Sequence, residues 1–179
     1  MNGEVAHYLL ILADRRAIAW VLESQQMAFP PTARAEVRDL KPGDELFIYI
    51  TRGAYQNPSR DRGRVVGRAT AVSAVEWLPE AVKIGPREFP RGCKIDVHKL
   101  APWGAGVELV PLLARMEVFP VPQVWSAKLR RPMLRIPASD AALLREELSP
   151  WSTTRDEALS GYVDRATVRP TGVRAARRS

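Results

Sequence analysis

The segment LKPGDELFIYIT (40–51) constrains the fold more than any other part of this sequence. One face of the strand that it predicts is wholly apolar, and the other carries Phe47, Tyr49 and Thr51. A strand that is mostly apolar on both faces is typical of the centre of a covered sheet. The Pro–Gly pair before it has the chemistry of a type II turn. We therefore expect a central strand that the chain enters through a tight turn.

Other patterns predict further strands and helices. A compact apolar run at 7–13 predicts a buried strand, and the next segment, 14–25, has helical spacing with Asp14 as its N-cap. A second amphipathic helix is expected over 139–149, capped by Ser139 or Asp140. The remaining expected elements are strands at 64–78 (long, with a bulge or curl), 93–103 and 132–137, helical turns at 109–116, and loops at 29–40 and 52–63.

This order of elements indicates an α+β fold. Fifteen prolines and eleven glycines favour many turns and short elements, and the 46% hydrophobic content is enough for a core. Runs of strands with helices at the flanks are typical of a small open barrel rather than of an alternating, doubly wound sheet. We expect one domain over residues 1–149 and a basic, mobile tail over 150–179.

The sequence contains little that would hold a metal or a cofactor. It has two histidines and one cysteine, Cys93, whereas zinc sites use three or four such ligands. It has no phosphate-binding glycine loop and no nucleophile elbow. We therefore expect no metal and no cofactor. A single cysteine, an apolar run too short for a signal peptide and the lack of a membrane-length apolar stretch predict a soluble, cytoplasmic protein.

Charge favours a polyanionic partner. The net charge is +7, and 22 arginines stand against five lysines. Nucleic acid is the commonest partner of such a chain, although a solvated basic surface gives the same composition. The basic residues form two clusters: Arg52, Arg60, Arg62, Arg64 and Arg68, and Lys128, Arg130, Arg131 and Arg135.

The aromatic residues are few, and three of them lie beside prolines. Phe29 and Phe89 each precede a proline, and Trp125 follows two. Such residues can form the walls of a stacking pocket, or they can pack under a loop as a satellite of the core. Trp20, on the first helix, is expected to be partial core.

The chain resembles the EVE domain, a branch of the PUA-like superfamily that is related to the YTH readers of methylated RNA. The resemblance runs from about His7 to Leu148. Its markers are HYLLILADRR, MAFPPTARAEVRDL, LKPGDELFIYI, GRVVGRATAVSAVE, FPRGCKIDV and the long segment from LVPLLARM through VWS to the helix at 139–149. It implies a PUA-like mixed β pseudo-barrel of five to six strands with flanking helices and a cavity at one end.

The resemblance also implies which residues meet a ligand. Asp14 matches a polar residue after the first strand, and the pair Trp125–Ser126 matches a late Trp–Ser pair that lines the cavity. A stretch that often supplies a tryptophan wall holds Met27, Ala28 and Phe29 here. The full set expected in a base pocket is Asp14, Met27, Ala28, Phe29, Tyr49, Phe89, Trp125 and Ser126. The set expected to hold phosphate is Arg60, Arg62, Arg64, Lys128, Arg130 and Arg131.

The function expected from these features is a non-catalytic module that binds DNA or RNA by holding a modified base in an aromatic-lined pocket. Asp14 and Ser126 would hydrogen-bond the edge of the base. One alternative is a small enzyme that hydrolyses a nucleoside or an amide with Glu45 or Glu76 as its base. Another is a protein-interaction module that uses the basic tail.

Overall fold

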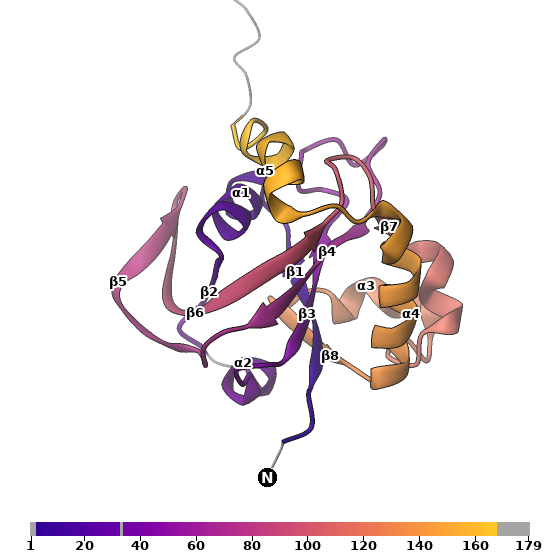
Figure 1. The fold of residues 1–179 in the computed structure, drawn as a ribbon, viewed down its shortest axis with the longest axis horizontal. Coiled ribbons are helices and arrows are strands. Elements are labelled where there is room, and N and C mark those ends of the chain that lie inside the picture. Colours follow the sequence, from indigo (N-terminus) through magenta and orange to yellow (C-terminus); the bar gives the residue numbers. More distant parts are fainter. Residues whose placement is uncertain (1–2, 33, 168–179) are drawn as a thin grey trace, which may run out of the picture.

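A computed structural model describes residues 3–32 and 34–167 of the chain (Figure 1). The strands are β1 (His7–Leu12), β2 (Gln26–Phe29), β3 (Glu45–Ile50), β4 (Arg64–Ala71), β5 (Glu76–Ile84), β6 (Arg87–Leu100), β7 (Val107–Glu108) and β8 (Met133–Ile136). The helices are α1 (Arg15–Ser24), α2 (Ala35–Asp39), α3 (Trp125–Lys128), α4 (Ala138–Leu148) and α5 (Arg155–Val163). Three 3₁₀ turns are η1 (Val110–Arg115), η2 (Pro122–Val124) and η3 (Ser149–Trp151).

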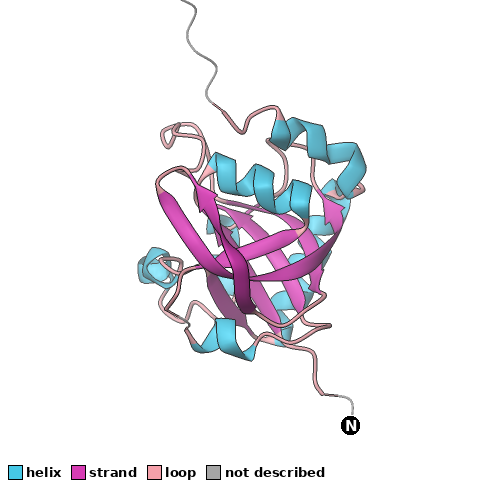
Figure 2. Ribbon diagram, turned by 90° about the vertical axis from the view of Figure 1, so that its left-hand side faces the viewer, coloured by secondary structure: helices cyan, strands magenta, loops and turns pink. Residues whose placement is uncertain are grey.

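The strands form one curled sheet with helices on both sides (Figure 2). Its order is β2-β6-β4-β3-β1-β8, with β5 paired to β6 and β7 paired to β4. The β1–β3 pair is parallel, and the other paired strands are antiparallel. The expected α+β half-barrel is confirmed, with eight strands in place of five to six.

Strand β3 lies in the interior of the sheet, as its apolar faces predicted, and the buried strand β1 lies between β3 and the edge strand β8. In β1, Tyr8 and Leu10 pack into one core cluster, and Leu9 and Ile11 pack into another on the opposite face. Helices α1 and α5 lie together at one end of the molecule, and α3 and α4 lie on the other side (Figure 1).

The long strand expected at 64–78 is two strands. β4 ends at Ala71 after a register shift beside Arg68, and β5 begins at Glu76 as the first arm of a hairpin with β6. The turn of that hairpin uses Gly85, whose φ of 57° lies in the left-handed region that favours glycine. The hairpin projects from the sheet beside α1 (Figure 1).

Helix α4 starts where the sequence indicated, but its expected cap is wrong. Neither Ser139 nor Asp140 caps the helix. The carboxylate of Asp140 is 1% exposed and accepts hydrogen bonds from the backbone N–H groups of Glu117 (2.8 Å) and Val118 (2.9 Å). A buried carboxylate needs such donors. Asp140 therefore bonds to the loop before η2 and does not cap the helix in which it lies.

The folded unit continues past residue 149, where the sequence indicated a boundary. Helix α5 is capped by Thr154, and Ala158 and Tyr162 are part of the first core cluster. The hydroxyl of Tyr162 donates to the carbonyl of Ala101 (2.6 Å), and Arg155 Nε donates to the carbonyl of Leu22 (2.7 Å). Residues 150–167 therefore complete the core beside α1, and the rest of the expected tail, 168–179, lies outside the described residues.

Candidate functional site

A cavity of about 400 Å³ opens at the carboxyl ends of β1 and β3, and we call it the Trp20 cavity. Segments from distant parts of the chain form it. Its lining residues are Ile11–Asp14, Ala17, Trp20, Val21, Met27, Ala28, Pro30, Thr51, Ile84, Arg87, Phe89 and Leu129–Pro132.

Two aromatic rings line this cavity. Trp20 comes from α1 and Phe89 from β6, and the guanidinium of Arg87 lies 5.2 Å from the centre of the Phe89 ring. Met27 adds a polarisable thioether to the wall. The cavity thus offers flat apolar surface, which suits a planar ligand.

Trp20 is the wall residue that sequence reasoning missed. An α-helix turns by about 100° per residue, so Trp20 lies almost opposite the buried side chains of Ile18 and Leu22. The structure leaves Trp20 half-buried, although it also packs against the first core cluster. A large aromatic residue off the apolar stripe of an amphipathic helix was the signal that could have found it.

Asp14 supplies an anionic acceptor at the cavity rim. Its Oδ1 accepts from the backbone N–H of Arg16 (2.8 Å), and its Oδ2 accepts from the Arg16 guanidinium (2.8 Å). The side-chain hydrogen bond from Arg16 holds the pKa of the Asp14 carboxyl below its ordinary value. An ionised carboxylate accepts hydrogen bonds and donates none, so its remaining lone pairs suit an N–H donor of a ligand.

Three arginines line the Trp20 cavity. The Arg131 guanidinium is bonded to the Glu36 carboxylate at 2.6 Å. Among the described residues, Arg87 and Arg130 have no carboxylate within ion-pair distance. Their positive charge is therefore available to an anionic ligand.

The structure gathers only part of the base-pocket set expected from the sequence. Asp14, Met27, Ala28 and Phe89 line the Trp20 cavity, as do Arg130 and Arg131 of the phosphate set. The residues of the two sets that do not line it are Phe29, Tyr49, Trp125, Ser126, Lys128, Arg60, Arg62 and Arg64.

Packing explains the position of the three aromatic residues among them. Phe29 and Tyr49 are 1% and 2% exposed and belong to the two core clusters, one on each face of the sheet. Trp125 opens α3 and packs against the second cluster, as a satellite of the core. Ser126 beside it is exposed, and Lys128 is half-buried.

Arg60, Arg62 and Arg64 line a second, smaller cavity of about 180 Å³, which we call the arginine cavity. Tyr55 and Trp103 form part of its wall. Thr51, the residue that follows β3, lines both cavities, so the two cavities are neighbours.

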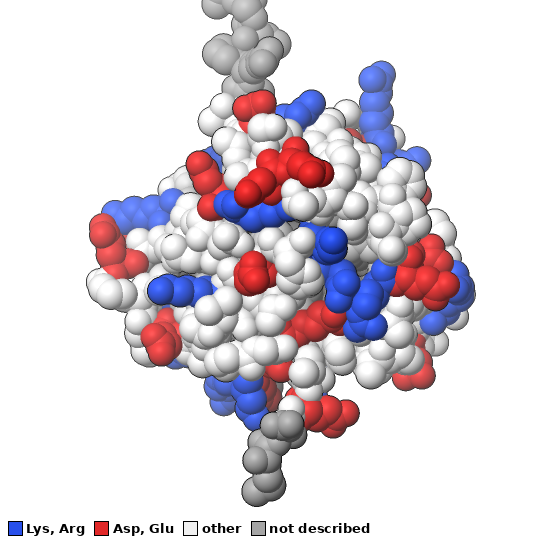
Figure 3. Space-filling model, in the orientation of Figure 1, with Lys and Arg blue, Asp and Glu red and all other residues white. Residues whose placement is uncertain are grey.

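The positive charge forms no single continuous patch on the face drawn in Figure 3. On the face drawn in Figure 3, basic and acidic side chains are interspersed. Attraction of a polyanion therefore depends on particular arginines, such as those of the two cavities, more than on this face.

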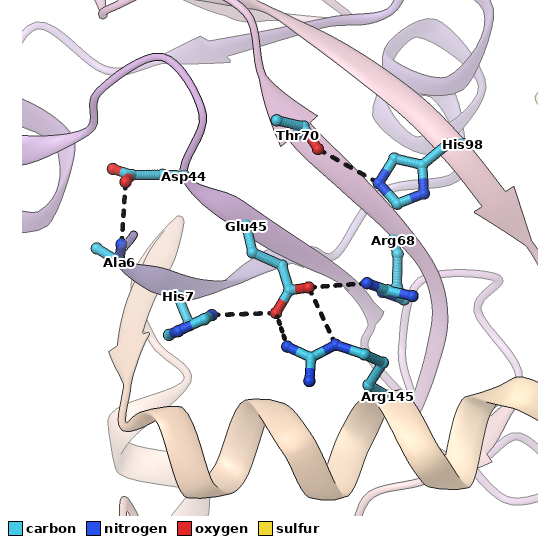
Figure 4. A network of polar contacts seen from close by, with 8 residues as sticks. All are labelled: Ala6, His7, Asp44, Glu45, Arg68, Thr70, His98 and Arg145. Atoms are coloured by element: carbon cyan, nitrogen blue, oxygen red, sulfur yellow. Dashed lines mark hydrogen bonds and ion pairs between the residues drawn. The ribbon is translucent and has the colours of Figure 1, made fainter. Parts of the chain in front are cut away.

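Glu45, named in the enzyme alternative, lies in an ion-pair network (Figure 4). Its oxygens contact His7 Nδ1 (3.0 Å), Arg68 Nη2 (2.9 Å) and Arg145 Nη2 (2.8 Å). Burial alone raises the pKa of this carboxyl, but the bonds from Arg145, Arg68 and His7 outweigh burial and lower it. Glu45 lines neither cavity, and a fully bonded carboxylate with a lowered pKa is a poor general base.

Other groups with catalytic chemistry are also placed apart from the cavities. Glu76 is exposed at the start of β5, and burial raises the pKa of the Cys93 thiol to about 12, so it stays protonated at neutral pH. Within residues 3–32 and 34–167, no three His, Cys, Asp or Glu side chains gather as a metal site would require. The helices in these ranges are also too short or too polar to cross a bilayer.

Comparison with known proteins identifies the fold. No protein-family model matches the sequence, and no curated protein is significantly similar to it. The Mmi1 YTH domain in complex with RNA is similar at a TM-score of 0.55 and 13% identity, over 82% of this chain and 79% of that one. Rpa0253 from Rhodopseudomonas palustris is similar at a TM-score of 0.53 and 15% identity, over 82% of this chain and 94% of that one. Human THYN1 in complex with DNA that contains 5-methylcytosine is similar at a TM-score of 0.49 and 11% identity, over 79% of this chain and 97% of that one.

The YTH domains with TM-scores above 0.5 show that this chain shares their fold. The mixed α+β half-barrel that the resemblance implied is therefore the fold that this chain shares with them. At these identities the likeness establishes the fold, and the function must be argued from the cavities.

Proposed function

We propose that the chain is a non-catalytic nucleic-acid-binding module that holds a modified base, such as a methylated one, in the Trp20 cavity. The observation that carries this proposal is the pairing of two aromatic walls, Trp20 and Phe89, with Arg87 and Arg130 on the rim of one cavity. Flat apolar walls suit a base, and guanidinium groups suit the phosphates on either side of it.

The fold supports the proposal. The Mmi1 YTH domain, which shares this architecture, was solved in complex with RNA. A volume of about 400 Å³ also falls within the range of roughly 300–1,000 Å³ that is usual for small-ligand pockets.

The energetics of base capture are consistent with this cavity. Extruding a base from its stack costs a few kcal/mol, and it costs least when the nucleic acid is already single-stranded. Stacking on an aromatic side chain returns about 1–3 kcal/mol per base. A methyl group buried against Met27 or Phe89 would add about 0.8 kcal/mol, so the discrimination expected from a methyl group is a few-fold.

Each residue of the rim has a role in this proposal. Asp14, as an ionised acceptor, would accept a hydrogen bond from an amino or imino group on the edge of the base. Arg130 and Arg87 would contact phosphate. The guanidinium of Arg131 is already bonded to Glu36, so a phosphate would have to share it with that carboxylate. Such phosphate contacts add affinity without reading sequence.

The test is a titration of RNA and DNA oligonucleotides, with and without one methylated base, against the full chain and Trp20→Ala. We expect Trp20→Ala to weaken binding by about 5- to 100-fold, because one stacking wall is lost. Trp151→Ala is the matched control, since Trp151 is 49% exposed in η3 and lines neither cavity. Equal binding of all oligonucleotides, or none at low salt, would overturn the proposal.

A further inference from the structure

The arginine cavity has three basic residues and one acidic residue in its lining. Arg60, Arg62 and Arg64 give +3 and Asp61 gives −1, which leaves +2. Arg64 contacts Glu108 at 3.4 Å, and Arg62 Nη1 donates to the backbone carbonyl of Asp61 at 3.2 Å. Among the described residues, Arg60 and Arg62 have no carboxylate within ion-pair distance. This cavity therefore attracts an anion.

The aromatic rings of this cavity already carry cations. Tyr55 and Trp103 meet edge to face at 5.4 Å. The guanidinium of Arg15 lies over the Tyr55 ring at 5.3 Å, and that of Arg165 lies over the Trp103 ring at 3.8 Å. Both rings of this cavity have a guanidinium over them, whereas in the Trp20 cavity Phe89 has one and, among the described residues, Trp20 has none. The arginine cavity therefore suits a charged group better than a stacked base.

The loop that carries these arginines is built from short turns. The backbone N–H groups of Arg60 and Asp61 donate to the carbonyl of Asn57 at 3.1 and 2.9 Å. Gly63 lies where a Cβ atom would overlap the hydroxyl of Tyr49, so only glycine brings the chain this close to the core. Arg62 and Arg64 are thereby fixed on either side of this contact.

The two cavities share a lining residue whose backbone is held in the sheet. Thr51 lines both, and its backbone N–H donates to the carbonyl of Leu12 at 3.0 Å, which ties the ends of β3 and β1 together. A nucleic-acid strand that places a base in the Trp20 cavity would carry its adjoining phosphate past Thr51.

From these observations we propose that the arginine cavity binds the phosphate group next to the captured base, so that the smallest complete ligand is a dinucleotide step. This inference rests on the proposed function of the Trp20 cavity. The phosphate would be held by Arg60 and Arg62, and Asp61 would oppose it.

The experiment replaces single phosphates by uncharged methylphosphonates on each side of the methylated base, and compares the full chain with the double variant Arg60→Gln/Arg62→Gln. For the full chain, we expect one flanking replacement to weaken binding about tenfold, because a charge-assisted contact is lost. The same replacement should have little effect on the double variant, whose contact is already missing. Binding by the double variant should also depend less on salt. The magnitude of the slope of log affinity against log salt concentration should fall by about 1, because each single-strand phosphate contact contributes roughly 0.7.

Two further variants separate a phosphate contact from a general charge effect. Arg38→Gln/Arg115→Gln removes two exposed arginines that line neither cavity, and should keep the full methylphosphonate effect. Asp61→Asn removes the opposing charge and should strengthen oligonucleotide binding a few-fold. Melting temperatures of all variants establish that each is folded.

The outcomes of the experiment distinguish this inference from the proposed function. If the methylphosphonate effect is absent, or is equal in the double variant and in the full chain, the arginine cavity does not bind this phosphate. The free methylated nucleoside tests the Trp20 cavity alone: it should bind the full chain and the double variant equally, and Trp20→Ala more weakly. If neither the nucleoside nor any oligonucleotide binds, both proposals fail.

Discussion

At the scale of single residues, Trp20 packs against the first core cluster, as the sequence indicated, but it also lines a cavity, whereas Trp125 lines neither cavity. Trp20 lies on the far side of α1 from its buried stripe and lines a cavity. Trp125 follows a proline-rich segment, yet it packs against the second core cluster beside Leu129 and Leu143. Both rings are half-buried, so exposure alone does not separate them. The distinction lies in which groups each ring contacts.

For Trp125→Ala we expect a loss of stability with unchanged nucleic-acid affinity. Its ring is partly buried, so the cost should be about 2 kcal/mol, below the 3–5 typical of fully buried aromatic residues. In a chain of this size that lowers the melting temperature by about 4–8 °C. Thermal unfolding and oligonucleotide titration of one preparation measure both effects. A large loss of affinity without a change in melting temperature would instead mean that Trp125 contacts the ligand.

At the scale of elements, Glu45 joins four segments of the fold. It begins β3, and its carboxylate bonds to side chains from β1, β4 and α4 (Figure 4). The carboxylate is 13% exposed, so water screens these bonds only in part. The network holds helix α4 against the end of the sheet where β1 and β3 begin.

Because the pKa of Glu45 is lower in the folded chain than its ordinary value of 4.5, the network stabilises the fold above that pH. The contribution is lost as the pH falls through the lowered folded pKa, when the carboxyl is protonated. We expect Glu45→Gln to cost about 2 kcal/mol at pH 7, roughly half the value for breaking a fully buried pair. The difference from the natural chain should shrink steadily below pH 4.5.

Urea unfolding between pH 7 and pH 3 measures this dependence. The matched control is Glu76→Gln, because Glu76 is exposed and the described residues give it no ion pair. This control should show almost no change in stability across the range. A pH-independent cost of Glu45→Gln would mean that its side chain acts by shape and not by charge.

At the scale of the whole molecule, the C-terminal part of the chain contributes to the same core as β1. Tyr162 of α5 is 1% exposed, and Arg155 bonds to two carbonyls at the end of α1. Helix α1 in turn carries Trp20, so α5 supports one wall of the candidate site from behind. Deleting residues 151–179 would therefore disturb this wall together with the tail.

Two truncations test this arrangement. A chain that ends at residue 149 should melt about 10 °C lower or more, because it loses the burial of Tyr162 and its hydrogen bond. A chain that ends at Thr167 keeps α5, and should retain both its melting temperature and the binding of a free methylated nucleoside. The protein-interaction alternative is best tested with this second truncation. Equal melting temperatures for both truncations would contradict the packing described here.

Local patterns in the sequence determined much of the fold. The apolar runs at 7–13 and 45–51 identified a buried strand and a central strand, and Asp14 identified the start of α1, because burial and capping act over a few adjacent residues. The sequence pattern did not show that the strand expected at 64–78 is divided into two strands. That division depends on the pairing of β5 with Arg87–Gly92 of β6, and the expected strands at 64–78 and 93–103 left out both this part of β6 and the second half of β5.

The membership of the site was decided by the tertiary structure. The sequence by itself determined an α+β fold, an excess of arginine and a set of aromatic residues braced by proline. Which of those aromatic rings face a cavity depends on α1, the β5–β6 hairpin and the segment before β8 meeting at the end of the parallel strands. Stacking surfaces are formed by residues far apart in the chain, and their contact is fixed only when the core packs. For that reason Trp20 lines the cavity, whereas Trp125, which has the more suggestive neighbours in sequence, supports the core.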